Sequence, residues 1–303
     1  MGQVVVLGLI GGSIYALFAL GVVMVYRGTG VLSFAQGEIG TASLYVAAFL
    51  VVDHGMPWYV GALAALVAGT ALGVLFDLAV VRRMIGTDPV SVAVATVGFL
   101  LLLTTVEILY AGPTIKALPA PFAGTHFELA GVVITPTQVA ALVLAIALGF
   151  GLQSLLRRTD FGLGILAAAQ DPVAVRLVGV PLSRVSATVW GAGAALSVIA
   201  ALLVEPTVGV FTPGYASQLY LVGLAAAVIG GLTSLPGAVV GGLVLGLLES
   251  LSTRYLGSTG LPGLRYVVVL VALLVVLLGR QLLPELRARL APAHPAVPEQ
   301  VTA

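Results

Sequence analysis

The sequence is poor in the residue types that soluble enzymes use for chemistry. It contains no cysteine, three histidines and a single lysine, Lys116. Without cysteine there is no disulfide, thiol nucleophile or zinc–thiolate site. Charged residues make up 8% of the 303 residues, against about 25% in soluble globular proteins. A surface with so little charge cannot keep a chain of this size in water, so the composition excludes a soluble enzyme.

Charge patterning and catalytic motifs are equally sparse. The net charge is +1, so there is no basic field for nucleic acid. The histidines (His54, His126 and His294) all fall in predicted loops or the C-terminal tail, and no His-Glu-x-x-His or Gly-x-Ser-x-Gly motif occurs. A P-loop is also missing. We therefore predict a protein that is not an enzyme and needs no cofactor or metal, with any ATP hydrolysis carried out by separate subunits.

Long apolar runs dominate what is present. The mean hydropathy is +1.16, and a membrane span needs about 20 apolar residues. The predicted fold is all-α, a polytopic transmembrane helical bundle of eight or nine spans with broken helices. The predicted spans are 3–26, 34–52, 58–81, 90–110, 136–156, 185–205, 218–232, 238–252 and 264–279.

Two interruptions make the span count uncertain between eight and nine. The polar run Ser33-Phe34-Ala35-Gln36-Gly37-Glu38 opens the second stretch, so we expect that stretch to start bent or partly unwound. The run Gly230–Gly237 splits an apolar stretch too long for one crossing, because Gly and Pro free backbone hydrogen bonds. Four glycine pairs with small-xxx-small spacing predict close helix packing: Gly8/Gly12, Gly69/Gly73, Gly237/Gly241 and Gly242/Gly246.

Arginines set the predicted orientation, because basic residues are retained in short cytoplasmic loops. With nine crossings the N-terminus is outside, the C-terminus is inside, and ten basic residues lie inside against three outside. A re-entrant 34–52 segment would instead place the N-terminus inside. The first span lacks the basic region and cleavage site of a signal peptide, so we expect it to be retained. The inside residues are Arg27, Arg82, Arg83, Arg157, Arg158, Arg176, Arg184, Arg280, Arg287 and Arg289; those outside are Lys116, Arg254 and Arg265.

The predicted organisation is a permease domain over 1–284 and a polar cytoplasmic tail over 285–303. Loop 157–184 is cytoplasmic, and loop 111–135 is the longest outside segment. The latter is read either as a contact for a soluble partner or as a packed surface cap.

Carboxylates at membrane depth are costly and usually face a cavity or a partner. Glu38, Glu107 and Glu249 qualify, with Asp77 and Glu205 nearer the span ends. Glu38 follows the break, and an unwound segment beside a helix N-terminus can coordinate an anionic or zwitterionic group. The alternative is that Glu38 is a structural carboxylate that accepts hydrogen bonds from unpaired backbone amides. We read Glu107 and Glu249 as structural.

The cytoplasmic loop contains a predicted short helix over 171–179. Asp171 can cap it, Pro172 suits its first position, and Gly179 can end it. Apolar residues surround the single charge, Arg176, and so short a helix is marginal alone in water. We expect a groove on another protein to receive it.

Three separated motifs resemble branched-chain amino-acid ABC transporter permeases of the Liv H type. The first runs from Gly12-Ser13-Ile14-Tyr15-Ala16-Leu17 to the Ser33–Glu38 run. The second is Ala167–Val180, similar to that family's ATPase-docking segment. The third is Gly230–Ala238, continuing to Glu249-Ser250.

The resemblance implies a bacterial inner-membrane subunit that pairs with a second, M-type permease. It further implies two ATP-binding subunits below and an extracytoplasmic substrate-binding protein that delivers branched-chain or related amino acids. We expect the transport pathway to involve Ser33, Gln36, Gly37, Glu38 and Thr96, and ATPase coupling to involve Gln170, Asp171, Pro172, Arg176 and Gly179. The sequence departs from the family pattern at Ser33, Gln36, Leu100 and Thr104, which leaves urea or short amides as alternative cargo.

Two other classes remain alternatives. An ion-gradient-driven secondary transporter or channel would use Glu38 as its proton or cation group. The other alternative is a structural scaffold, but a scaffold would not need a bent segment that carries an acidic residue.

Overall fold

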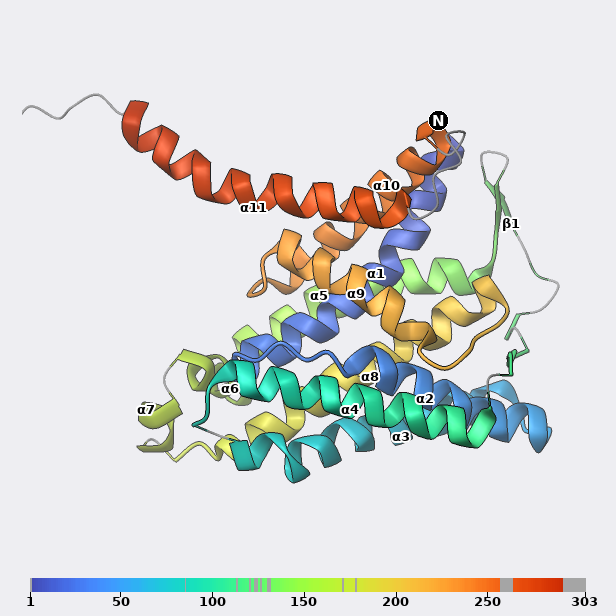
Figure 1. Cartoon of the computed structure of the whole chain (residues 1–303), viewed down its shortest axis with the longest axis horizontal. Coiled ribbons are helices and arrows are strands. Elements are labelled where there is room, and N and C mark those ends of the chain that lie inside the picture. Colours follow the sequence, from blue (N-terminus) through green and yellow to red (C-terminus); the bar gives the residue numbers. More distant parts are fainter. Residues whose placement is uncertain are drawn as a thin grey trace, which may run out of the picture.

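The computed structural model describes residues 2–290 apart from 85, 113, 120, 123, 124, 126, 130, 131, 171, 178 and 257–263. Within these residues the regular secondary structure is helical apart from one small hairpin, and a helix occupies each of the nine predicted stretches (Figure 1). They are α1 (Gly2–Thr29), α2 (Gln36–Ala48), α3 (Trp58–Ala79), α4 (Pro89–Ala111), α5 (Pro136–Arg158), α8 (Leu182–Val208), α9 (Tyr215–Gly230), α10 (Leu235–Leu256) and α11 (Leu264–Leu290).

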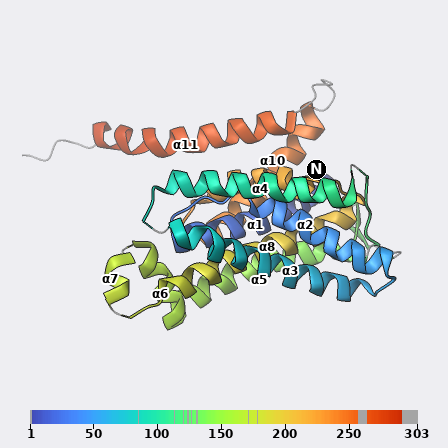
Figure 2. The same ribbon diagram turned by 60° about the horizontal axis from the view of Figure 1, so that its bottom comes forward.

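Helices α1 and α8 form the centre of the bundle. Their apolar windows are 72% buried, whereas those of α3, α4 and α5 are 33% buried or less. Helix α11 contacts α9 and α10 and otherwise lies along the outside of the bundle (Figures 1 and 2). Among the described residues, six helices are long and apolar enough to cross a membrane: α1, α3 (extended to Met84), α4, α5, α8 and α10.

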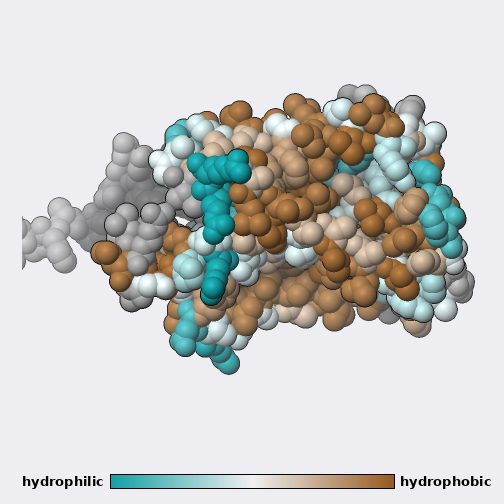
Figure 3. All heavy atoms as spheres, turned by 90° about the horizontal axis from the view of Figure 1, so that it is seen from below, coloured by the Kyte–Doolittle hydropathy of each residue, from teal (hydrophilic) through white to brown (hydrophobic). Residues whose placement is uncertain are grey.

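The outer surface has the pattern of a membrane belt. Figure 3 shows one face that is largely hydrophobic, crossed by a narrow hydrophilic band towards the end where α6 (Asp160–Gln170) and α7 (Pro172–Leu177) lie in Figure 1. Exposed apolar side chains on α3, such as Leu63, Val67 and Leu75, are typical of the lipid-facing surface. Exposed arginines lie at this same end, on the 3₁₀ turn Val81–Met84 that follows α3, at the end of α5 and at the start of α8: Arg82, Arg83, Arg157, Arg158 and Arg184.

The close packing predicted from the glycine pairs is confirmed where α1 crosses α10. A Cβ atom added at Gly246 would lie 2.3 Å from both the amide nitrogen of Gly12 and the carbonyl oxygen of Gly8. At Gly242 it would lie 2.5 Å from the amide nitrogen of Ala16. The two helices therefore meet backbone to backbone, which only glycine permits.

The predicted interruption between α9 and α10 is present, but its boundaries differ. Helix α9 ends at Gly230, and α10 begins at Leu235 rather than at 238. Pro236 falls in the first turn of α10, where its missing N–H has no helical partner to lose. The backbone N–H of Gly237 donates to Ser234 Oγ at 3.0 Å, so Ser234 caps the new helix.

Two short helices form the loop after α5. Sequence reasoning predicted α7 (Pro172–Leu177) but missed α6 (Asp160–Gln170). The signal for α6 was Thr159, whose Oγ1 accepts a hydrogen bond from the Gly162 N–H at 3.0 Å. A Cβ at Gly162 would lie 2.5 Å from the Cα of Leu156, so this glycine allows α6 to fold back against α5.

The C-terminal boundary extends further than predicted. Helix α11 passes Pro284 and ends at Leu290, so the first six residues assigned to the polar tail are helical. One proline removes a single hydrogen bond and need not end a helix, and Leu and Arg in the following segment favour helix. The rest of the tail, 291–303, lies outside the described residues.

The loop after α4, which we predicted to lie outside, is partly packed against the end of α8 and the segment that follows it. The backbone of Lys116 exchanges hydrogen bonds with Phe211 at 2.8 and 3.0 Å, and Leu118 N–H donates to Glu205 Oε1 at 2.9 Å. A two-stranded antiparallel hairpin, β1 (Phe127–Leu129) and β2 (Val132–Ile134), precedes α5.

Replacement of Gly246 by Ala should destabilise the fold. Alanine normally improves an exposed helix position by about 1 kcal/mol, but here its methyl group meets backbone, and overpacking costs about 1–3 kcal/mol. Thermal unfolding in detergent should show a lower midpoint for Gly246→Ala. The matched control is Gly151→Ala on α5, where an added Cβ meets nothing within 4 Å. Equal midpoints for the two variants would contradict this account of the crossing.

Candidate functional site

The break before α2 is held by side chains from two other helices. Residues 30–35 are not helical, and α2 begins at Gln36. The N–H of Phe34 donates to Thr96 Oγ1 on α4 at 2.9 Å. The hydroxyl of Tyr220 on α9 donates to the carbonyl oxygen of Ser33. These bonds satisfy backbone groups that a continuous helix would have paired internally. The non-helical segment can therefore lie inside the bundle without leaving these backbone groups unpaired.

Glu38 lies in the first turn of α2 and is fully buried. Its Oε1 accepts a hydrogen bond from Thr104 Oγ1 on α4 at 2.5 Å, and its Oε2 accepts one from Ser217 Oγ on α9 at 2.5 Å. Its hydrogen-bond partners are thus hydroxyls on two neighbouring helices, and the carboxyl group joins α2 to both.

Glu107 on α4 is the second carboxyl group of this region. It is 4% exposed, and its Oε2 accepts a hydrogen bond from the Gly214 N–H at 3.3 Å. It lies close enough to Glu38 for the two carboxyl groups to interact directly. Sequence reasoning treated Glu107 separately, because residues 69 positions apart give no sign of such proximity.

The amide of Gln36 occupies a niche on the other side of α2. Its Nε2 would lie 2.5 Å from a Cβ added at Gly193, and its Oε1 would lie 3.2 Å from one added at Gly21. Among the described residues neither amide atom has a hydrogen-bond partner, and the same holds for the Ser33 and Ser197 hydroxyls. Buried polar groups are usually paired with protein or water, so this niche has unused hydrogen-bonding capacity.

Gly37 sets the distance between α2 and α9. A Cβ at this position would lie 2.7 Å from both the Cα of Ser217 and the Cβ of Tyr220. The glycine thus lets α9 approach closely enough for Ser217 to reach Glu38.

The structure brings the five predicted pathway residues together, since Thr96 bonds the segment that carries the other four. The four that have side chains (Ser33, Gln36, Glu38 and Thr96) are at most 1% exposed. They form an enclosed polar cluster, packed among α1, α4, α8 and α9. Thr104, Ser217 and Tyr220 complete it. Sequence reasoning noted Thr104 only as a departure from the family pattern and missed Ser217 and Tyr220.

The predicted coupling residues lie far from this cluster, at the end of the bundle that carries α6 and α7 (Figure 1). Gln170 ends α6 and Pro172 begins α7. Gly179 has a φ of 87°, a left-handed value that suits glycine as the helix terminator. Arg176 lies within α7, and Asp171 lies outside the described residues. Leu177 is 86% exposed, so α7 offers an apolar side chain to its surroundings.

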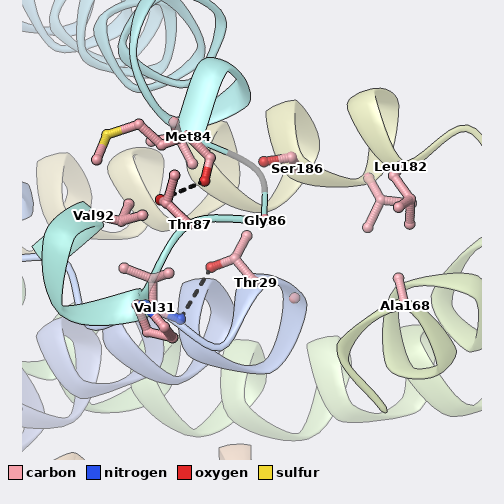
Figure 4. A pocket seen from close by; sticks show the side chains of 13 residues that line it. Thr29, Val31, Met84, Gly86, Thr87, Val92, Ala168, Leu182 and Ser186 are labelled. Carbon is pink, nitrogen blue, oxygen red and sulfur yellow. Dashed lines mark hydrogen bonds between the residues drawn. The ribbon is translucent and has the colours of Figure 1, made fainter. Parts of the chain in front are cut away.

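A mostly apolar cavity of about 210 Å³ lies at this end, lined by residues of α1, the α3–α4 connection, α6 and α8. Figure 4 shows Thr29 and Val31 from the end of α1 on one side, Met84 and Thr87 from the α3–α4 connection on another, and Ala168 from α6 facing them. Ser186 on α8 lines the cavity and donates a hydrogen bond to Asp77. The cavity thus lies between α6 and the segment that leads from α1 into the break before α2.

Comparison with known proteins gives consistent matches over most of the chain. Residues 4–278 match the family described as branched-chain amino acid transport system / permease component. The chain is 30% identical over 268 residues to the high-affinity branched-chain amino acid transport system permease protein BraD of Pseudomonas aeruginosa, covering 84% of this chain and 87% of that protein.

Two further relatives are called LivH. The high-affinity branched-chain amino acid transport system permease protein of Escherichia coli K12 is 30% identical over 284 residues, covering 89% of this chain and 92% of that protein. The probable branched-chain amino acid transport permease protein of Methanocaldococcus jannaschii is 28% identical over 255 residues, covering 81% and 79%. No solved structure matches the chain.

Loss of the Thr104 hydroxyl should weaken the cluster. Thr104→Val keeps the side-chain shape but removes a donor to Glu38, and a buried group left short of a partner costs about 1–3 kcal/mol. The neighbouring Thr105 is the matched control, because it makes the same hydrogen bond to a carbonyl one turn back but is exposed. We expect Thr104→Val alone to lower the unfolding midpoint in detergent. Indistinguishable midpoints would show that the bond to Glu38 contributes no stability.

Proposed function

Because this chain belongs to the family of branched-chain amino acid transport permease components, we propose that it is the membrane-spanning permease subunit of an ATP-binding-cassette importer. Its cargo is a branched-chain or related small amino acid, carried inward across the bacterial cytoplasmic membrane. The observation that carries the proposal is the extent of the family match, residues 4–278, which includes the break before α2 and both loop helices. The chain is a multi-pass membrane protein, in keeping with this role.

The proposed assembly contains a second permease subunit, two ATP-binding subunits and an extracytoplasmic substrate-binding protein. The chain has no P-loop, and its only lysine lies in the loop after α4, so ATP must be hydrolysed elsewhere. The exposed arginines at the α6–α7 end support a cytoplasmic location for that end. Helix α7, with Leu177 exposed, supports docking of an ATP-binding subunit there.

We assign a gating role to Ser33, Gln36, Gly37, Glu38 and Thr96. The cluster is closed in this structure, and it is built from hydrogen bonds between helices rather than from a continuous apolar core. Such bonds can exchange partners as helices shift. Partners for the unpaired Gln36 amide and Ser33 hydroxyl would then be available in another state of the transport cycle.

The energy source distinguishes this proposal from its main rival. An ion-gradient-driven transporter would use the buried pair Glu38 and Glu107 as its proton or cation site. Co-purified complex in proteoliposomes, supplied with binding protein and labelled leucine, should take up leucine only with internal ATP. Uptake should stop with a catalytically dead ATP-binding subunit and persist when an ionophore collapses the gradients. Uptake that follows the gradient and ignores the dead subunit would overturn the importer proposal. A parallel assay with urea tests the alternative cargo.

Helix α7 should couple ATP turnover to transport. Leu177→Asp and Arg176→Glu place a negative charge on a surface that we expect to enter an apolar groove on the ATP-binding subunit, so both should reduce subunit retention and uptake at least tenfold. The matched control is Lys116→Glu, a charge reversal at the opposite end of the bundle, which should leave retention unchanged. Full retention and uptake in both α7 variants would remove α7 from the coupling interface.

A further inference from the structure

A polar groove runs between the N-terminal half of α1 and the C-terminal half of α10. This open groove has a volume of about 580 Å³ and lies at the end of the bundle opposite α7, close to the N-terminus in Figure 1. Its polar lining consists of Gln3, Tyr15, Glu249, Ser250, Thr253 and Arg254. None of these residues belongs to the cluster around Glu38.

The groove is made from one face of each helix. On α1 the lining positions are Gln3, Val4, Leu7, Gly11 and Tyr15, which recur every three or four residues and so lie along one stripe of the helix. On α10 the lining residues also fall on one face, three or four positions apart: Gly246, Glu249, Ser250, Thr253 and Arg254. The two stripes face each other and form the two walls of the groove.

This face is unlike the lipid-facing surface of the same protein. Exposed positions on α4 and α5 carry large apolar side chains, for example Leu101 and Val143. The α10 stripe carries a carboxylate, a guanidinium and two hydroxyls. Charged side chains on membrane helices face a water-filled cavity or a partner because lipid contact is costly. The α10 stripe therefore faces water or a polar partner rather than lipid.

The groove residues are held in place by defined contacts. Tyr15, 5% exposed, donates its hydroxyl to Glu249 Oε2 at 2.6 Å. Ser250 Oγ donates to the carbonyl oxygen of Val4 at 2.8 Å. The backbone contact between Gly246 and Gly12 fixes the distance between the two walls. Glu249 is thus oriented by a buried partner rather than left to rotate on the surface.

We infer that this groove receives the zwitterionic head group of the amino acid during transport, with Glu249 binding the ammonium and Arg254 the carboxylate. The inference rests on the proposed function. The two residues are five positions apart on one helix and both line the groove, and their opposite charges complement the two charges of an α-amino acid. Leu7 and Gly11 leave an apolar wall for its side chain. The groove would be a contact for cargo on its way to the closed cluster at α2.

Charge removal is the first test. In co-purified complex reconstituted with binding protein, Glu249→Gln and Arg254→Gln should each reduce ATP-driven leucine uptake at least tenfold, while the amount of co-purified ATP-binding subunit stays the same. Matched controls are Glu128→Gln and Lys116→Gln, which remove one charge of each sign at the same end of the bundle outside the groove. Wild-type uptake in both groove variants would overturn the inference and leave the importer proposal standing, whereas uptake by wild type without ATP would overturn the importer proposal itself.

Thiol labelling is the second test, and it does not depend on activity. Because the chain has no cysteine, Thr253→Cys introduces a unique thiol in the groove. A membrane-impermeant cationic thiol reagent should modify it in nanodiscs, as detected by mass spectrometry of this subunit, and leucine-loaded binding protein with ATP should slow the reaction. Leu101→Cys, on the apolar exposed face of α4, should not react. Labelling of Thr253→Cys at the same rate with and without cargo, or no labelling at all, would contradict a cargo-contacting groove.

Discussion

The backbone contact between α1 and α10 is the constraint on which much of this structure depends. Gly8 and Gly12 on α1 meet Gly246 on α10 at distances that exclude any side chain. Membrane helices gain little from the hydrophobic effect when they associate, because lipid tails are as apolar as leucine. Close backbone approach supplies the van der Waals contact instead. It also holds the two walls of the α1–α10 groove together and fixes the direction in which α10 leaves the turn after α9.

A second constraint follows from the break before α2. A non-helical segment inside a membrane bundle needs partners for each exposed backbone group. Thr96 and Tyr220 supply two of them, and Gly37 lets α9 come close enough for Ser217 to reach Glu38. The carboxyl group is therefore part of what holds α2, α4 and α9 together. If the proposed gating role holds, stability and transport draw on the same side chains here, so a variant of this region must be tested for folding before its transport is interpreted.

The sequence predicted the helices well because hydropathy and glycine spacing are local signals. It located the interruption before α10 and the short helix α7. It placed the start of α10 at 238 because Pro236 was read as a breaker, although proline is well tolerated in a first turn. The meeting of Glu38 with Thr104, Ser217 and Glu107 was not predictable from one sequence, since it depends on which faces of three helices point inward. The groove was missed for the same reason: Glu249 was read as a structural residue near a span end, and Tyr15 is 234 positions away.

The two polar regions differ in how they can respond to movement. The α1–α10 contact leaves no space between backbones, so these helices cannot slide past each other without a clash, and Glu249 and Arg254 keep a fixed relation to Tyr15. The links to Glu38 are hydroxyl–carboxyl bonds, which can rotate or change partners at little cost in packing. A shape change driven from the α6–α7 end is therefore more easily absorbed at α2 than at α1 and α10. The cavity beneath α6 lies beside the segment that leads from α1 to that break, which gives such a change a direct route. A rigid groove next to an adjustable break would allow cargo to be held on one side of α1 while the passage beyond it opens.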